Sequence, residues 1–156
     1  MDKNLSFKEH IEYTKKKCNS KIYLSRELKK LGYNKEELKY FYESSILSTM
    51  LYGYTAWCSA HQSSIEPLVK IHKQAETIIG HKLGDLQQCF NSKISNLFKS
   101  ATDKEHPLAI ILPENRSAVR EKSLRNDNNY SLPELRTEIF RRSFLYKACL
   151  LFNNTL

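Results

Sequence analysis

The sequence predicts an all-α protein: a bundle of about four helices, followed by a long loop and a C-terminal helix. Apolar residues recur at intervals of three and four, the period that places side chains on one face of an α-helix. Glycine and proline number only four each among 156 residues, fewer than the turns of an all-β or a Rossmann-like fold use. Polar residues at capping positions precede most of the periodic segments, which indicates where the helices begin.

The first helix is expected from about residue 6 to residue 31. Ser6 and Glu9 have the spacing of a capping box at its start, and Gly32 supplies the stop. The apolar stripe weakens in the second half, which predicts a kink or break near Asn19–Ser20. The residues of that stripe are Phe7, Ile11, Thr14, Cys18 and Ile22.

A second helix is expected from Asn34 to Trp57, with Asn34 and Glu37 as its capping box. Apolar residues surround it almost completely, which predicts a place at the centre of the bundle. One face carries Leu38, Tyr42, Ile46, Thr49 and Gly53, and the other carries Tyr40, Leu47, Leu51 and Tyr54. The small residues that would let a neighbouring helix approach are Ser45, Thr49, Gly53 and Ala56.

Two further helices follow in the same way. Ser63 and Glu66 form another capping box, Pro67 falls in the first turn, and Gly80 ends the third helix. Asp85 caps the fourth helix. The apolar faces are Leu68, Ile71, Ala75 and Ile79 in the third helix, and Leu86, Phe90, Ile94, Leu97 and Ala101 in the fourth.

Residues 102–130 are expected to form a loop with at most a short helical turn. Ser131 and Glu134 then have capping-box spacing and begin a last helix. The sequence therefore divides into a helical bundle at 1–102 and a segment at 103–156 that packs loosely or needs a partner, because so long a connection is unusual inside a compact domain. The face of the last helix is Phe140, Phe144, Ala148 and Leu151.

The chain has a net charge of +8 and an isoelectric point near 9.3. This charge favours an acidic partner, above all nucleic acid, and is also typical of a basic solvated surface. The scattered cysteines, Cys18, Cys58, Cys89 and Cys149, are expected to be buried thiols of an intracellular protein, cytoplasmic or nuclear. The longest apolar run, near Ile46–Trp57, is too short and too polar to span a membrane.

Six segments resemble, in the same order and with similar gaps, the region that follows the polymerase core in reverse transcriptases of non-LTR, LINE-type retrotransposons. The two most recognisable are SILSTMLYGYTAW at 45–57 and KIHKQAETIIG at 70–80. The other four are DKNLSFKEHI at 2–11, LSRELKKLG at 24–32, DKEHPLAIILPENRS at 103–117 and SFLYKACLLFNNTL at 143–156. The resemblance covers essentially the whole chain.

This resemblance implies a thumb-like helical segment that would hold a primer–template, RNA or an RNA–DNA hybrid, behind an active site. It also implies a polymerase core, N-terminal to this segment, as a partner. The first third of the chain is in addition similar to sequences named for the N-terminal domain of AlkB homologue eight, an alkylated-DNA-repair protein. That name carries methyltransferase and 2-oxoglutarate dioxygenase activities.

The residues themselves do not support these chemistries. Polymerisation needs neighbouring carboxylates around Mg²⁺ ions, and the aspartates of this chain are far apart in sequence. They are Asp2, Asp85, Asp103 and Asp127. The nearest approach to a dioxygenase iron motif is His10 with Glu12, which would point about 200° apart on a helix. A Gly-rich methyltransferase loop and a clustered set of zinc ligands are also missing, so we expect a non-enzymatic protein without a cofactor or metal.

Positively charged residues lie in three places: along the first helix, in the long loop and near the last helix. Phosphate contact requires only positive groups at suitable spacing, so we expect sequence-independent binding of nucleic acid. The candidate contacts are Lys8, Lys15, Lys16, Arg26, Lys29, Lys30, Arg116, Arg120, Arg125, Arg141 and Arg142.

Two alternatives remain open for this charge pattern. The lysines of the first helix are also compatible with a solvated helix face that binds nothing. The chain is also compatible with a helical protein-interaction module in which residues 103–156 fold on a partner. The aromatic residues Tyr23, Tyr33, Tyr40 and Trp57 are interpreted as packing groups rather than as platforms for base stacking.

Overall fold

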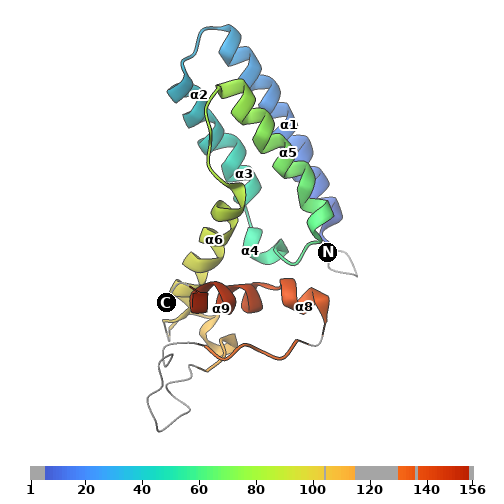
Figure 1. The fold of residues 1–156 in the computed structure, drawn as a ribbon, viewed down its shortest axis with the longest axis vertical. Coiled ribbons are helices and arrows are strands. Elements are labelled where there is room, and N and C mark those ends of the chain that lie inside the picture. The colour runs from blue at the N-terminus through green and yellow to red at the C-terminus, as the bar shows by residue number, and fades with distance from the viewer. Residues whose placement is uncertain (1–5, 104, 115–129, 136, 155–156) are drawn as a thin grey trace. The chain divides into compact units, whose positions relative to one another are not determined.

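The computed structural model describes residues 6–103, 105–114, 130–135 and 137–154 (Figure 1). Every regular element in these ranges is a helix, which confirms the all-α class. The chain divides into two compact units, residues 1–90 and 91–156, so the division falls inside a helix rather than after residue 102.

Helix α1 (Lys8–Lys30) is continuous, so the kink predicted near Asn19–Ser20 is wrong. The apolar stripe weakens there because Ser25 takes a buried position and its hydroxyl donates a hydrogen bond to the Lys21 carbonyl within the helix. The helix also begins differently: Phe7, in the left-handed region at φ 53°, is the N-cap and makes no side-chain cap, in place of the expected capping box.

The end of α1 is as predicted. Gly32 has φ 91°, which a glycine adopts without steric cost. Its N–H donates to the Lys29 carbonyl, and the N–H of Tyr33 donates to the Leu28 carbonyl. These two bonds form a Schellman motif, which satisfies carbonyl groups that the helix end leaves free.

The predicted second helix runs without a gap to Leu51, with a π-helical turn inside it, and a single break separates it from a short last piece. Its elements are α2 (Lys35–Phe41), the π-helical turn η1 (Tyr42–Leu47), α3 (Ser48–Leu51) and α4 (Tyr54–Trp57). The capping box at the start is confirmed, because the Asn34 side chain accepts from the Glu37 N–H and the Glu37 carboxylate accepts from the Asn34 N–H. The break falls at Gly53, whose φ of 61° is incompatible with a continuing helix.

The π-helical turn keeps one row of side chains in the core. Leu38, Tyr42, Ile46 and Met50 recur every four residues and are all buried. An α-helix turns too fast to keep such a row on one side, and a π-helix, with its i to i+5 hydrogen bonds, turns more slowly. Hydroxyl groups compensate carbonyls in this stretch: Ser44 donates to Tyr40, Ser48 to Ser44 and Thr49 to Ser45.

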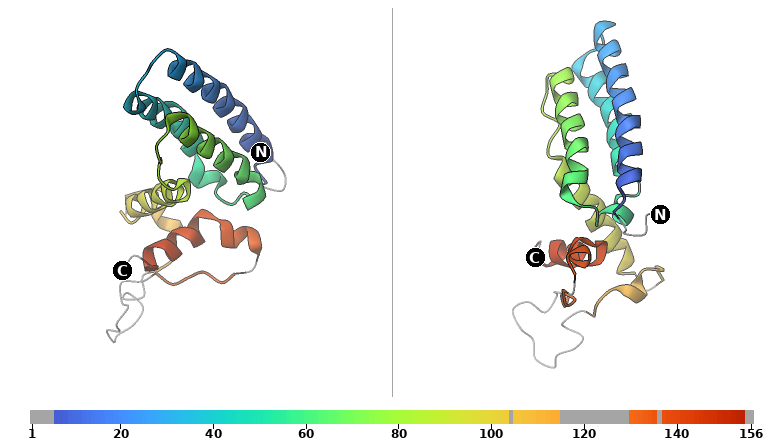
Figure 2. Two further views of the ribbon diagram at one scale, coloured as in Figure 1. Left: turned by 45° about the horizontal axis from the view of Figure 1, so that its top comes forward. Right: turned by 90° about the vertical axis from the view of Figure 1, so that its right-hand side faces the viewer.

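Helix α5 (Gln62–Ile79) runs beside α1 and in the same direction, as Figures 1 and 2 show. Both helices are antiparallel to the α2–α3 segment, as is usual for neighbouring helices joined by short connections. The Lys29 ammonium of α1 donates to the carbonyl of Ile78 in the last turn of α5. Gly80, at φ 72°, ends α5 as predicted.

The start of α5 differs from the prediction. Its N-cap is His61, whose Nδ1 accepts from the N–H of Ser63, so Ser63 and Glu66 do not form the cap. Pro67 consequently lies in the second turn rather than the first. The carbonyl that loses a hydrogen bond to the proline is that of Ser63, an exposed residue that water can reach.

An aromatic cluster surrounds α4. The Tyr54 and Phe90 rings stack with centroids 4.1 Å apart, and Trp57 meets Tyr54 edge to face at 4.8 Å. The indole N–H of Trp57 donates to the Tyr52 carbonyl at 3.0 Å. This cluster confirms Trp57 as a buried anchor, although it closes α4 rather than one long helix.

Helix α6 (Leu86–Ala101) begins at Asp85, whose carboxylate accepts from the N–H of Gln87, as predicted. The second unit then contains the short η2 (Ala109–Ile111), α8 (Glu138–Arg142) and α9 (Phe144–Asn154). The capping box predicted at Ser131 and Glu134 is wrong. Thr137 caps α8 instead, because its hydroxyl accepts from the N–H of Phe140.

Three rings form the centre of the second unit. Phe98, Tyr130 and Phe152 meet pairwise with centroids 5.0 to 5.4 Å apart. The amide of Asn153 fixes Tyr130 from both sides, since it accepts from the Tyr130 N–H and donates to the Tyr130 carbonyl, each at 3.0 Å. The segment near Tyr130 is therefore attached to α9 by side-chain contacts rather than by a helix of its own.

Candidate functional site

Helix α1 carries more than half of the net positive charge of the chain, +5 of +8. It contains eight Lys and Arg residues against three Glu, a net charge of +5 within 23 residues. At 1.5 Å per residue it is about 35 Å long, so this charge is spread along a rod rather than gathered at a point. The helix is therefore the main electrostatic feature of the first unit.

Three of the predicted contacts on α1 are open to solvent. Lys8, Lys16 and Arg26 are exposed, and their side chains make no ion pair or hydrogen bond with another described residue. Lys8 and Arg26 are 18 residues apart, which is five turns, so they lie on the same side of the helix about 27 Å from each other. These side chains are the ones that need to break no internal interaction to meet a phosphate.

Two more predicted contacts are held by carboxylates on the same helix. Lys15 lies 3.2 Å from Glu12, and Lys30 lies 2.8 Å from Glu27. Pairs of this kind on an exposed helix contribute about 0–1 kcal/mol. A phosphate can therefore replace the carboxylate at small cost.

Lys29 and Lys21 have structural contacts. The Lys29 ammonium donates to the Ile78 carbonyl, at the end of α5 where the helix dipole is negative. Lys21 reaches the second helical segment, where its ammonium lies 2.8 Å from the Ser45 carbonyl and 2.6 Å from the Thr49 hydroxyl. Ser45 and Thr49 thus lie against α1, as expected of small residues, whereas Gly53 and Ala56 are exposed.

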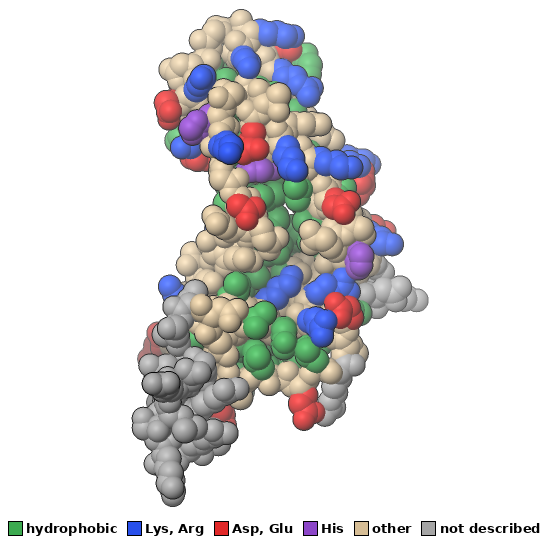
Figure 3. Space-filling model, viewed as in Figure 1, with side chains coloured by type: hydrophobic (Ala, Val, Ile, Leu, Met, Phe, Trp, Pro, Cys, Tyr) green, Lys and Arg blue, Asp and Glu red, His purple; other side chains and the backbone are tan. Residues whose placement is uncertain are grey.

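The remaining predicted contacts belong to the second unit. Arg141 lies 3.7 Å from the Glu138 carboxylate, and Arg142 donates through Nε to the Glu138 carbonyl. Arg116, Arg120 and Arg125 lie outside the described residues. On the face drawn in Figure 3, basic side chains are interspersed with acidic ones and do not merge into one basic surface.

The four aromatic residues interpreted as packing groups are not all buried. Trp57 is buried, but Tyr23, Tyr33 and Tyr40 are exposed, so their interpretation as packing groups is wrong. Tyr23 lies on α1 opposite its buried side, and Tyr40 lies on α2 opposite Leu38. The apolar stripes of both helices are complete without these rings, which is why the rings remain at the surface.

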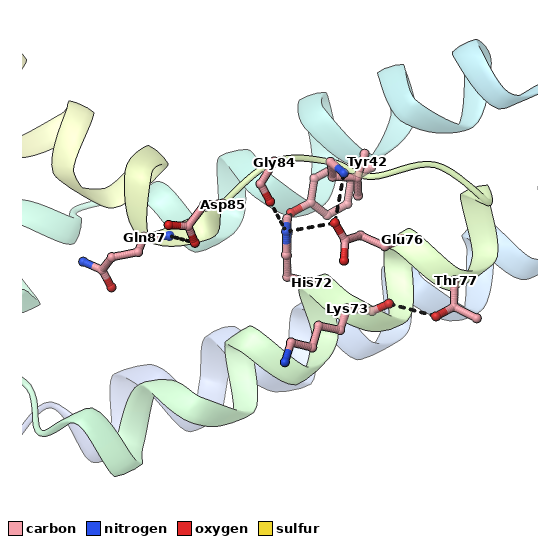
Figure 4. A network of polar contacts seen from close by, with 9 residues as sticks. Tyr42, His72, Lys73, Glu76, Thr77, Gly84, Asp85 and Gln87 are labelled. Carbon is pink, nitrogen blue, oxygen red and sulfur yellow. Dashed lines mark hydrogen bonds and ion pairs between the residues drawn. The ribbon is translucent and has the colours of Figure 1, made fainter.

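A polar cluster around His72 is the second candidate site (Figure 4). His72 is only 5% exposed. Its Nε2 lies 3.0 Å from the Gly84 carbonyl, which can only accept, so Nε2 carries the proton. Nδ1 of the neutral ring then accepts from the Tyr42 hydroxyl, 2.6 Å away. Both nitrogens of the buried ring are thus satisfied.

The same cluster fixes the connection between α5 and α6. The carboxylate of Glu76 accepts from the N–H of Leu83 at 3.0 Å and lies 3.8 Å from Nε2 of His72. A hollow of about 430 Å³ opens beside it, lined by His72, Lys73, Glu76, Lys82 and Asp85 among others. Its charges are mixed, and its polar groups hold the backbone of residues 83–84 in place.

Burial raises the pKa values of several groups without creating a reactive one. The pKa of the Cys18 thiol rises to about 11, since burial outweighs the opposing charge of Lys21. Burial raises the pKa of the Cys149 thiol to about 11. Burial also raises the pKa of Tyr54 to about 12. A thiol with a raised pKa is a poorer nucleophile and metal ligand. The prediction of buried cysteines is confirmed for Cys18, Cys58 and Cys149, while Cys89 is half-buried.

No group of three or more His, Cys, Asp or Glu side chains in the described ranges is placed to hold a metal ion. None of the helices there combines the length and apolar content of a membrane-spanning segment. No protein-family model, curated protein or solved structure matches this chain.

The structural roles of His72 and Lys21 were not predicted, although the positions of both residues relative to the apolar stripes indicate them. His72 follows Leu68 by four residues and Ile71 by one, so it falls on the apolar face of α5. Lys21 precedes Ser25 by four and follows Cys18 by three, which places it beside the buried side of α1. A polar residue within an apolar stripe indicates a buried contact on another element.

Proposed function

We propose that this chain is a non-catalytic helical segment that binds nucleic acid through its phosphates, without sequence preference, along α1. The exposed and unpaired Lys8, Lys16 and Arg26 on one long helix carry this proposal. The resemblance of six ordered segments to the region after the polymerase core of non-LTR reverse transcriptases supports the choice of an RNA–DNA hybrid as ligand. In this proposal the segment holds the hybrid beside a polymerase core and performs no chemistry itself.

The expected affinity is weak and depends on salt. Three phosphate contacts give a slope of log K against log salt of about −3 on a duplex, and five contacts, with Lys15 and Lys30 released from their carboxylates, give about −4.5. A slope in this range corresponds to non-specific binding driven by counterion release. It also sets the scale for each substitution, because one lost contact changes the slope by about 0.9.

The test is a fluorescence anisotropy titration of a labelled RNA–DNA hybrid with the full chain at several salt concentrations. Replacing Lys8, Lys16 and Arg26 with Gln is expected to reduce the slope by about 3 and to abolish most of the binding. The matched control replaces Lys70, Lys73 and Lys82 with Gln, which removes the same charge from exposed positions elsewhere in the first unit. Equal losses of affinity in both triple variants would show that binding depends on net charge rather than on α1. Absent or salt-independent binding would refute the proposal.

A protein-interaction module is the second candidate, and exposed apolar side chains in the second unit favour it. Those side chains are Ile110, Ile111, Leu132, Leu135, Ile139 and Leu150. Exposed apolar groups of this number are typical of surfaces that a partner covers. If this candidate is correct, a protein partner is recovered after nuclease treatment, and Ile110→Asp removes that partner while hybrid binding stays unchanged.

A further inference from the structure

The outward face of α1 carries two exposed tyrosines among its cations. Tyr13 is 57% exposed and Tyr23 is 59% exposed. Together with Lys16, Ser20 and Glu27 they follow intervals of three and four residues, so they form one stripe along the helix. Neither ring stacks on another aromatic ring of the described part of the chain, and the fold does not use them for packing.

Cations lie directly beside both rings. The Lys17 ammonium lies over the Tyr13 ring, 4.5 Å from its centroid. Lys16 is one turn from Tyr13 on the same stripe, and Arg26 follows Tyr23 by three residues. Lys30 follows Tyr23 by seven residues, which is two turns along the same side of the helix. Rings and positive groups therefore alternate along about five turns of one helix.

We propose that this face of α1 binds single-stranded nucleic acid, with bases stacked on Tyr13 and Tyr23 and phosphates held by Lys8, Lys16 and Arg26. This proposal rests on the proposed function, because it uses the same phosphate contacts, and it adds an unpaired strand to the RNA–DNA hybrid as a second class of ligand. An exposed ring beside cations attracts an unpaired base, because every base has a π-face and stacking on it needs no particular sequence. The bases of a duplex are stacked on one another, so a duplex offers only its phosphates to the same face.

The spacing of the two rings fits separate bases of one strand. Ten residues of α-helix separate Tyr13 and Tyr23, a rise of about 15 Å. Stacked bases advance about 3.4 Å each, so the two rings would contact bases about four steps apart. Lys8 and Arg26, about 27 Å apart, extend beyond both rings and would hold the phosphates on either side. The site is thus at least five nucleotides long, within the range of known single-strand sites of about 4–16 nucleotides.

Three labelled ligands of equal length separate stacking from phosphate contact. They are an oligothymidine of about 16 nucleotides, within the range of known site sizes, an abasic strand with the same number of phosphates, and an RNA–DNA hybrid. The full chain is expected to bind oligothymidine more tightly than the abasic strand. Replacing Tyr13 and Tyr23 with Ala is expected to weaken oligothymidine binding about fivefold or more for each ring, while binding of the other two ligands changes less than about twofold.

Two control variants make the result specific. Replacing both tyrosines with Phe keeps the rings, so oligothymidine binding should persist. Tyr52→Ala removes a tyrosine that is 77% exposed and lies outside α1, so it should have no effect. The inference is overturned if the Ala pair weakens abasic-strand binding equally, or if the Phe pair loses as much affinity as the Ala pair. Equal binding of all three ligands, unaffected by the Ala pair, would refute the stacking site and leave the phosphate site standing, whereas no binding of any ligand would refute both.

Discussion

Tyr42→Phe tests whether the buried hydrogen bond to His72 stabilises the first unit. The substitution removes one oxygen and leaves the ring, so the packing of Tyr42 is preserved. The hydroxyl that it removes donates to Nδ1 of His72 across 2.6 Å, in a site where His72 is 5% exposed. Nδ1 would then be a buried acceptor without a partner, which costs about 1–3 kcal/mol of the free energy of unfolding.

A double-mutant cycle isolates this interaction from other effects. In a His72→Leu background the Tyr42 hydroxyl has no partner to lose, so Tyr42→Phe should then cost less than about 0.5 kcal/mol. The Gly84 carbonyl also loses a donor in that background, but Gly84 is exposed and its carbonyl can bind water. The coupling energy between the two substitutions is therefore expected to be about 1–2 kcal/mol.

The assay is urea unfolding followed by the fluorescence of Trp57. This residue is the only tryptophan of the chain and is 2% exposed, so its emission reports unfolding of the first unit. The slope of the free energy against urea should stay constant across the four proteins, because the surface exposed on unfolding is the same. Additive effects, within about 0.3–0.5 kcal/mol, would show that the two residues do not interact and would refute the stabilising hydrogen bond.

Two further predictions concern α1 and the buried ionisable groups. Lys21→Met removes the hydrogen bonds from Lys21 to Ser45 and Thr49, so it should lower the free energy of unfolding in urea by about 1–3 kcal/mol. The control, Lys16→Met at an exposed position, should change it by less than about 0.5 kcal/mol. Equal effects of the two substitutions would contradict the structural role of Lys21. The free energy of unfolding should be constant from pH 7 to 9 and fall as the pH rises from 9 toward 11. The Cys18 thiol has an ordinary pKa of 9.0 in the unfolded chain and a pKa of about 11 in the folded protein. Between these two values the unfolded chain holds fewer protons than the folded protein, so a rise in pH favours unfolding. Urea midpoints across this pH series measure the fall, Cys18→Ala should make it shallower, and a flat profile to pH 11 would rule out the explanation.

Local sequence signals predicted the helix ends that depend only on neighbouring residues. The Asn34–Glu37 capping box, the glycine stops at Gly32 and Gly80 and the start of α6 at Asp85 are all confirmed, because each is formed by atoms within a few residues. Predictions were wrong where several local caps were possible. His61 precedes Ser63 as the cap of α5, and sequence spacing alone does not distinguish the two.

The broken second helix depended on distant residues. Ser45 accepts from an ammonium of α1, and Leu38 through Met50 must face the same core at four-residue intervals, which a regular α-helix does not allow. The candidate site was likewise predicted only in part. The sequence identified the cations of α1, but which of them are already engaged, as Lys29 is by Ile78, depends on contacts nearly fifty residues away in the chain.

The amino-acid sequence alone determined the helical class, several helix boundaries and the concentration of positive charge on the first helix, because periodicity, caps and charge are properties of short segments. Tertiary structure decided the π-helical turn, the buried His72 cluster, which lysines remain available and that Tyr13 and Tyr23 face solvent. The reason is that burial and hydrogen bonding between helices are fixed by which faces meet. The residues next to a side chain in the sequence do not specify which helix face it will meet.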